Sequence, residues 1–85
     1  MSEMSGREKF PIAKQLDARG LRCPLPLLRA KQALVALAVG EVLDILANDQ
    51  GALRDIPAWC QLSGQELLLQ EERDGMLRFL VRRTR

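Results

Sequence analysis

The sequence contains no histidine and no tyrosine, and only two of its 85 residues are cysteines. Without histidine the chain lacks the usual partner of a nucleophilic cysteine or serine, which disfavours acyl-transfer catalysis. The spacing of the two cysteines, Cys23 and Cys60, matches neither a zinc site nor an iron–sulfur site. We therefore expect no bound metal and no resident cofactor.

Long apolar runs are also absent. The longest, Ala33–Val39, is far shorter than the roughly 20 residues of a membrane-spanning helix, so no membrane contact is expected. The first nine residues lack the apolar core of a secretion signal, and we expect a cytoplasmic protein with reduced thiols. A chain of this length forms one domain, which we place at residues 12–85, after a flexible N-terminal leader at residues 1–11.

Charge of one sign does not dominate, since 13 basic and 11 acidic residues give a net charge of +2. There is no global basic field, and aromatic residues that stack on bases are few, so direct nucleic-acid binding is not expected. Arginines do concentrate near the C-terminus, at Arg78, Arg82, Arg83 and Arg85. They indicate either a charged edge strand that resists aggregation, the interpretation we favour, or a patch that docks RNA or protein.

Turn signals divide the chain into six elements in the order βαβαββ. Period-two alternation marks the strands, and apolar residues at helical spacing mark the helices. We expect strands at 12–17, 41–47, 65–72 and 76–83, and helices at 24–39 and 52–62. Gly40 is expected to end the first helix in a left-handed conformation, and Asp74-Gly75 is typical of a hairpin turn. Because Pro57 interrupts the second helix, that helix either kinks or begins at Asp55, which would cap it.

Two amphipathic helices and four strands predict an α/β (α+β) fold. The economical arrangement is a two-layer βαβαββ sandwich, with two helices on one face of a mixed four-stranded sheet. The first strand, first helix and second strand would then form a right-handed parallel unit. That unit places the loop before the first helix, and with it Cys23, at the carboxyl end of the first strand.

Cys23 stands at the start of the first helix, directly before Pro24. Pro24 and Pro26 cost little in a first turn, where their missing N–H groups would have no intrahelical partner, and they stiffen it. The free N–H groups of Leu25 and Leu27, with the positive end of the helix dipole, are expected to stabilise an anionic sulfur.

The loop before Cys23 adds to this picture. Arg19 and Arg22 bring positive charge near the sulfur, unless they and Asp17 are merely solvated loop charges. Gly20 is expected to form a tight turn whose backbone approaches the sulfur. All of these features favour a thiolate, the form that attacks a persulfide or disulfide sulfur.

A single activated thiolate has limited chemistry. The position three residues after Cys23 is Pro26, so a dithiol redox centre of the thioredoxin type is disfavoured. One thiolate does suffice to carry a persulfide, because each transfer is an attack by one thiolate on another protein's sulfur. Cys60 shares an apolar helix face with Leu53 and Ile56 and is interpreted as a small core hydrophobe, while Trp59 is expected at the rim of the core.

The segment Leu16–Leu27, with its Cys-Pro-x-Pro motif, resembles the signature of the TusA/SirA-like sulfur-carrier family, as do Lys31, Ala33 and Leu34 beyond it. The segment Asp55–Cys60 adds to the resemblance, which runs from about Lys14 to the C-terminus. It implies a sandwich similar to the C-terminal domain of a translation initiation factor. It also implies that Cys23 bears a transient persulfide.

The resemblance further implies partners. A cysteine desulfurase or rhodanese-like donor would charge Cys23, and a downstream acceptor protein would take the sulfur toward tRNA thiolation, molybdenum cofactor or related sulfur trafficking. Such a protein is a sulfurtransferase only as a stoichiometric carrier, and we expect a monomer. Leu25 departs from the version of the motif associated with the tRNA relay, where glutamate is common.

Two other functions remain open from the sequence. An RNA-binding module would rest on the arginine-rich last strand and the initiation-factor-like fold. A thiol-based regulatory or interaction protein would sense oxidants through Cys23. A carrier gains one sulfur atom from a desulfurase and cysteine, whereas a sensor forms a sulfenic acid or a disulfide with peroxide.

Overall fold

The chain alternates strands and helices in the order that the sequence predicts. A computed structural model describes residues 10–85, so residues 1–9 of the expected leader lie outside the described residues. The elements are β1 (Ile12–Asp17), α2 (Leu25–Val35), β2 (Val42–Ala47), α3 (Ala52–Ser63), β3 (Glu66–Arg73) and β4 (Met76–Arg82). No helix within residues 10–85 is long and apolar enough to span a membrane.

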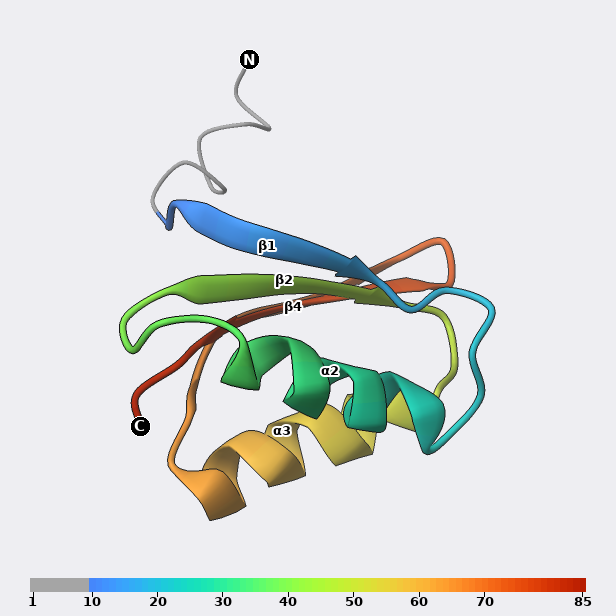
Figure 1. The fold of residues 1–85 in the computed structure, drawn as a ribbon. Helices are drawn as coiled ribbons and strands as arrows, with labels where there is room; N and C mark the ends of the chain where they lie inside the picture. The colour runs from blue at the N-terminus through green and yellow to red at the C-terminus, as the bar shows by residue number, and fades with distance from the viewer. Residues whose placement is uncertain (1–9) are drawn as a thin grey trace.

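The four strands form one mixed sheet in the order β1-β2-β4-β3. β1 runs parallel to β2, whereas β4 is antiparallel to both β2 and β3. Both helices cover the same face of this sheet and run side by side in the same direction (Figure 1). The predicted two-layer α+β sandwich is therefore confirmed.

The core lies between the helices and the two central strands. Every second side chain of β2 and of β4 faces the helices and is fully buried, because side chains alternate across a strand. These residues are Leu43, Ile45, Ala47, Leu77, Phe79 and Val81. They pack against Ala30 and Leu34 of α2 and against Ile56 and Cys60 of α3. The central pair of strands therefore fixes the position of both helices.

The prediction that the arginine-rich last strand is a sheet edge is wrong. β4 lies between β2 and β3, and the edges are β1 and β3. The arginines of β4 alternate with its core residues and so occupy the face away from the helices. There Arg82 forms an ion pair with Glu66 of β3 at 2.8 Å, which satisfies its charge on the sheet surface.

Arg78 also has a partner within the sheet. Its guanidinium donates hydrogen bonds to both carboxylate oxygens of Asp44, at 3.0 and 2.9 Å, and Gln15 donates a third at 3.0 Å. Asp44 is only 2% exposed, so this carboxylate depends on its donors for the solvation that water would supply. The pair thus explains a charged residue in the middle of the central strand β2.

We predict that Arg78→Met lowers the free energy of unfolding by about 3 kcal/mol, because it leaves a buried carboxylate without its cation. The double variant Asp44→Leu, Arg78→Met removes both charges and should recover most of that loss. Urea denaturation followed by circular dichroism measures both. Equal loss in the single and double variants would contradict this account of Asp44.

The first helix ends earlier than predicted. α2 stops at Val35 instead of Val39, and the guanidinium of Arg83 donates hydrogen bonds to the carbonyls of Val35 and Leu37. These carbonyls lack intrahelical donors at a helix end, so the arginine caps the helix from the far end of the chain. Gly40 does adopt a left-handed φ of 96°, but its N–H donates to the Arg83 carbonyl and it ends no helix.

The second helix is continuous through Pro57. It begins at Ala52, so the alternative start at Asp55 is wrong, and Asp55 lies in the first turn. Gly64, with a left-handed φ of 81°, ends the helix by donating its N–H to the Cys60 carbonyl. Because Gly51 is the N-cap residue, Asp55 does not cap the helix.

The interpretation of Cys60 and Trp59 is confirmed. Cys60 is 3% exposed within the core, and burial raises the pKa of its thiol to about 11. Trp59 is half-buried and packs against the same core from its rim.

We predict that only one thiol of the native protein reacts rapidly with iodoacetamide at pH 8, because Cys60 is both inaccessible and protonated. Unfolding in urea should release the second thiol. Mass spectrometry of the alkylated chain counts the modified residues and places them by peptide mapping. Rapid labelling of Cys60 in the folded protein would refute the assigned burial.

Candidate functional site

The carboxyl ends of the parallel strands β1 and β2 meet at one end of the sheet, and the loops that follow them are tied together. The N–H of Ala18 donates to the Leu46 carbonyl at 2.8 Å, and the N–H of Gly20 donates to the Asn48 side chain at 2.9 Å. The first loop leads to Cys23 and the second leads to α3. The sheet therefore brings Cys23 to the start of both helices.

Cys23 is exposed in the turn directly before α2. Pro24 is the N-cap residue after a cis peptide bond, and Pro26 is the buried second residue of the helix. The N–H of Leu25 donates to the Arg22 carbonyl at 2.7 Å, so the expectation that this donor is free for the sulfur is wrong. The apolar side chain of Leu25, two residues after Cys23, is 42% exposed.

The prediction that Arg19 brings its charge to the sulfur is also wrong. Arg19 donates two side-chain hydrogen bonds, both of 2.8 Å, to the carboxylate of Asp17, and these lower the pKa of Asp17 to about 2. Its charge is therefore engaged with Asp17. Arg22 is exposed and contributes its carbonyl to the turn. The cation that lowers the pKa of Cys23 is Arg54 of α3, although larger effects oppose it.

Asp55 is the group that dominates the environment of the sulfur. The thiol of Cys23 donates a hydrogen bond to its Oδ2 atom at 3.1 Å. This bond, followed by partial desolvation and by the negative charges of Asp55 and Asp49, raises the pKa of Cys23 above its ordinary value. A nearby anion disfavours a second anion, so the resting sulfur is a protonated thiol and not the expected thiolate.

Gly51, the N-cap of α3, lies against Cys23. A Cβ atom at this position would lie 3.0 Å from the Cys23 Cβ and 3.2 Å from its Sγ. The Cβ atom would also lie 2.8 Å from Asp49 Oδ2, and because the φ of Gly51 is −60°, it is space and not conformation that favours glycine here. Gly20, which was predicted to approach the sulfur, has a left-handed φ of 86° and no atom near the position of its missing Cβ, and its N–H ties the loop to Asn48.

Two features of this site were missed from the sequence. Asp55 was considered as a helix cap, and Gly51 was not predicted to have a role at the site. The missing information was the packing of α3 against the Cys23 turn, which places Gly51 against Cys23 and brings Asp55 within hydrogen-bond distance of the sulfur. The short segment Asp55–Cys60 in the family resemblance was the one signal that pointed to this helix.

The arrangement supports chemistry by a single thiol. Cys23 is accessible to another protein's sulfur, while Cys60 is buried and cannot resolve a disulfide with it without unfolding. Within residues 10–85 no group of three or more metal-ligating side chains comes together. The carboxylate of Asp55 is positioned to accept the proton when the thiol ionises. Leu27 is half-buried against the core and borders a groove that runs from Asp55 between the helices.

Comparison with known proteins agrees with this geometry. Residues 14–83 match the family model described as sulfurtransferase TusA. The chain belongs to this family. It is 42% identical over 71 residues to the sulfur carrier protein TusA of Allochromatium vinosum, a match that covers 84% of this chain and 93% of the relative.

The fold is shared with a protein of known structure. The crystal structure of a SirA-like protein from Desulfitobacterium hafniense superposes with a TM-score of 0.74 at 26% sequence identity. The match covers 85% of this chain and 99% of that one. The family predicted from the Cys-Pro-x-Pro motif and its flanks is therefore confirmed.

We predict that Asp55→Asn makes Cys23 react several-fold faster with iodoacetamide at pH 7. The substitution removes the negative charge that opposes the thiolate, and the thiolate is the reactive form. The whole rate profile against pH should move toward lower pH, with the same plateau at high pH.

Asp74→Asn, in the β3–β4 turn, makes the same change in charge at a carboxylate that takes no part in raising the pKa of Cys23, and it serves as the matched control. Its rate should equal that of the native chain. An Asp55→Asn profile that coincides with the native one would show that Asp55 does not hold the thiol.

Proposed function

We propose that this protein is a sulfur carrier that accepts a persulfide sulfur on Cys23 and relays it to an acceptor protein. The observation that carries the proposal is the single exposed thiol of Cys23, presented in a Cys-Pro-x-Pro turn at the meeting point of two helix starts. Membership of the TusA family, with a relative named as a sulfur carrier, supports the same role.

The transfer requires no external oxidant or reductant. The Cys23 thiolate attacks the terminal sulfur of the donor's cysteine persulfide, the donor's S–S bond breaks, and a new S–S bond forms on Cys23. The donor cysteine leaves as a thiolate, and the proton released by Cys23 is available to it, with Asp55 as the nearest intermediate acceptor. The same exchange in the next step moves the sulfur from Cys23 to the acceptor.

The donor is proposed to be a cysteine desulfurase or a rhodanese-like protein in the cytoplasm, and the carrier acts stoichiometrically as a monomer. The acceptor serves tRNA thiolation, molybdenum cofactor synthesis or related sulfur trafficking. The exposed apolar side chain of Leu25, where the tRNA relay commonly has glutamate, favours an acceptor surface that makes an apolar contact beside the thiol.

The rival functions are less well supported. Two of the C-terminal arginines, Arg78 and Arg82, are paired with carboxylates of the sheet, so they are not free to bind phosphates. An oxidant sensor depends on a readily ionised thiol, whereas the carboxylate of Asp55 keeps Cys23 protonated.

The test is intact-mass spectrometry after incubation with a cysteine desulfurase and cysteine. We expect the native chain and Cys60→Ala to gain one sulfur atom that dithiothreitol removes, and Cys23→Ala to gain none. Incubation with hydrogen peroxide instead of the desulfurase is the control for an oxidant sensor. A mass gain that persists in Cys23→Ala, or none on the native chain, would refute the proposed relay.

A further inference from the structure

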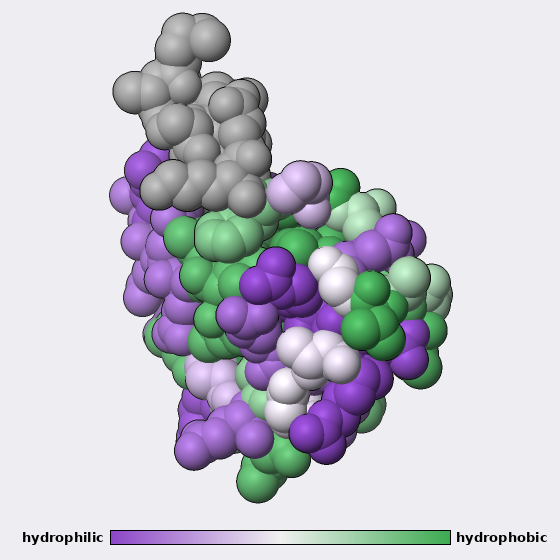
Figure 2. Space-filling model, turned by 90° about the vertical axis from the view of Figure 1, so that its left-hand side faces the viewer, coloured by the Kyte–Doolittle hydropathy of each residue, from purple (hydrophilic) through white to green (hydrophobic). Residues whose placement is uncertain are grey.

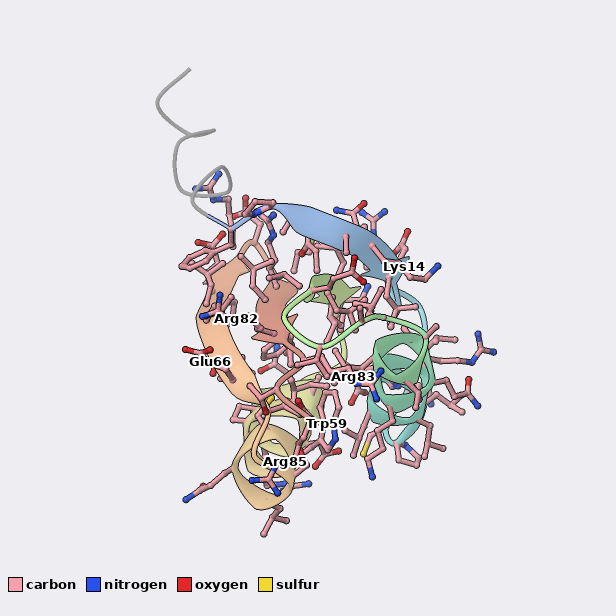
Figure 3. All side chains as sticks on the ribbon, turned by 60° about the vertical axis from the view of Figure 1, so that its left-hand side comes forward. Lys14, Trp59, Glu66, Arg82, Arg83 and Arg85 are labelled. Atoms are coloured by element: carbon pink, nitrogen blue, oxygen red, sulfur yellow. The ribbon has the colours of Figure 1, made fainter. Side chains whose placement is uncertain are left out.

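A groove of about 560 Å³ lies between α2 and α3, and Asp55, the hydrogen-bond partner of Cys23, is part of its lining. Its walls are apolar side chains from both helices: Leu27, Leu34, Val35, Ala58, Trp59 and Leu62. Figure 3 shows Trp59 on the α3 side of the gap between the two helices, with Arg83 and Arg85 nearby. A concave apolar surface with a few polar groups at its ends is the usual form of a binding site.

The two ends of the groove differ in charge. Asp55, which holds the Cys23 thiol, lies at the end where both helices begin. Arg83 lies where α2 ends, with its guanidinium on the carbonyls of Val35 and Leu37, and the side chain of Arg85 lies against Gly64 at the end of α3. Lys31 is a third cation in the lining, and within residues 10–85 no carboxylate forms an ion pair with any of the three.

The apolar rim of the groove is unusually exposed. Leu62 is 88% exposed and Val35 is 67% exposed, and they face the groove from opposite helices. Figure 2, which views this end of the molecule, shows hydrophobic and strongly hydrophilic surfaces side by side. Exposed apolar side chains bordered by charges are characteristic of a surface that docks another protein.

The length of the groove limits what fills it. Asp55 and Leu62 are seven residues apart on α3, which corresponds to about 10 Å at 1.5 Å per residue. An extended peptide of about three or four residues covers this distance, as do about two turns of a helix. The occupant is therefore a short segment, with its direction set by the charges at the two ends.

We propose that the groove docks a short segment of the sulfur donor or acceptor protein, with an apolar middle, carboxylates over Arg83 and Arg85, and its sulfur-bearing cysteine beside Cys23. This inference rests on the proposed sulfur relay and adds the kind of partner that it uses. The charge complementarity positions the incoming sulfur, while the apolar contacts supply most of the binding free energy.

The test uses disulfide exchange with three synthetic peptides, each carrying one cysteine capped with cysteamine. After the cysteine, the first peptide has leucines followed by two glutamates, the second has leucines followed by two lysines, and the third has serines followed by two glutamates. The Cys23 thiolate attacks the capped sulfur of a peptide, cysteamine leaves, and a mixed disulfide forms without net oxidation. Intact-mass spectrometry of an equimolar mixture measures the share of each product.

We expect the leucine–glutamate peptide to exceed each of the others by about tenfold, as one apolar and one charge-assisted contact would give. Arg85→Glu should reverse the preference between the glutamate and lysine peptides, and Lys31→Glu, which changes another cation of the lining, should weaken it. Lys14→Glu makes the same charge change on β1, outside the groove, and should leave the preference unchanged. Leu62→Ser should reduce the leucine preference, whereas Val39→Ser, an exposed apolar residue outside the groove, should not.

Equal yields from the three peptides, or a preference that survives both charge reversals, would overturn the groove proposal. So would sedimentation showing a native dimer that Leu62→Ser dissociates, because a second copy would then fill the groove. The persulfide relay is tested separately by sulfur gain on Cys23. Sulfur gain without a peptide preference would overturn only the groove proposal. A peptide preference without sulfur gain would overturn only the proposed relay.

Discussion

The hydrogen bond between the Cys23 thiol and Asp55 connects the starts of the two helices, and the rest of the site is arranged around it. The parallel pairing of β1 and β2 brings their carboxyl ends together, and the tied loops carry Cys23 onto α3. Gly51 provides the space for this contact, since a Cβ atom would press on the cysteine. Two opposed effects act on the sulfur, the helix N-termini and the carboxylate of Asp55. The helix N-termini favour a thiolate, but their partial positive charge is spread over several amides. The full negative charge of Asp55 is in direct contact, so it prevails and the thiol stays protonated.

A protonated, exposed thiol is suited to a carrier that must meet its partners without reacting on the way. Because the thiolate is the attacking form, Asp55 lowers the rate of reaction with small oxidants and disulfides in solution. The bond itself lies at the surface, where a hydrogen bond can be exchanged at little cost in free energy. The groove begins at this same carboxylate, so one aspartate links the resting state of the sulfur to the surface where the partner is proposed to dock.

Local sequence patterns predicted the parts of the fold that local forces determine. The alternation in β2 and β4, the helical spacing in α2 and the Asp74-Gly75 turn each identify an element, and together they give the two-layer sandwich. The end of α2 could not be predicted in this way, because its last carbonyls are satisfied by Arg83, almost fifty residues away in the chain. The central position of β4 could not be predicted for a similar reason. The partner of Arg78 is Asp44, which lies on another strand and 34 residues away in the chain. Cys23 was identified from its motif, but the direction of its pKa shift was predicted wrongly. That direction depends on Asp55, which lies 32 residues later in the chain.

The protonation state of Cys23 in the native protein tests this account most directly. Selective ¹³C labelling of cysteine Cβ atoms allows each thiol to be titrated by its chemical shift, with Cys23→Ser identifying the two signals. The account predicts that the Cys23 signal titrates above the ordinary thiol pKa of 9.0, and that the Cys60 signal titrates near 11. A Cys23 signal that titrates below 9.0 would show that the helix starts outweigh Asp55, and it would contradict the central claim.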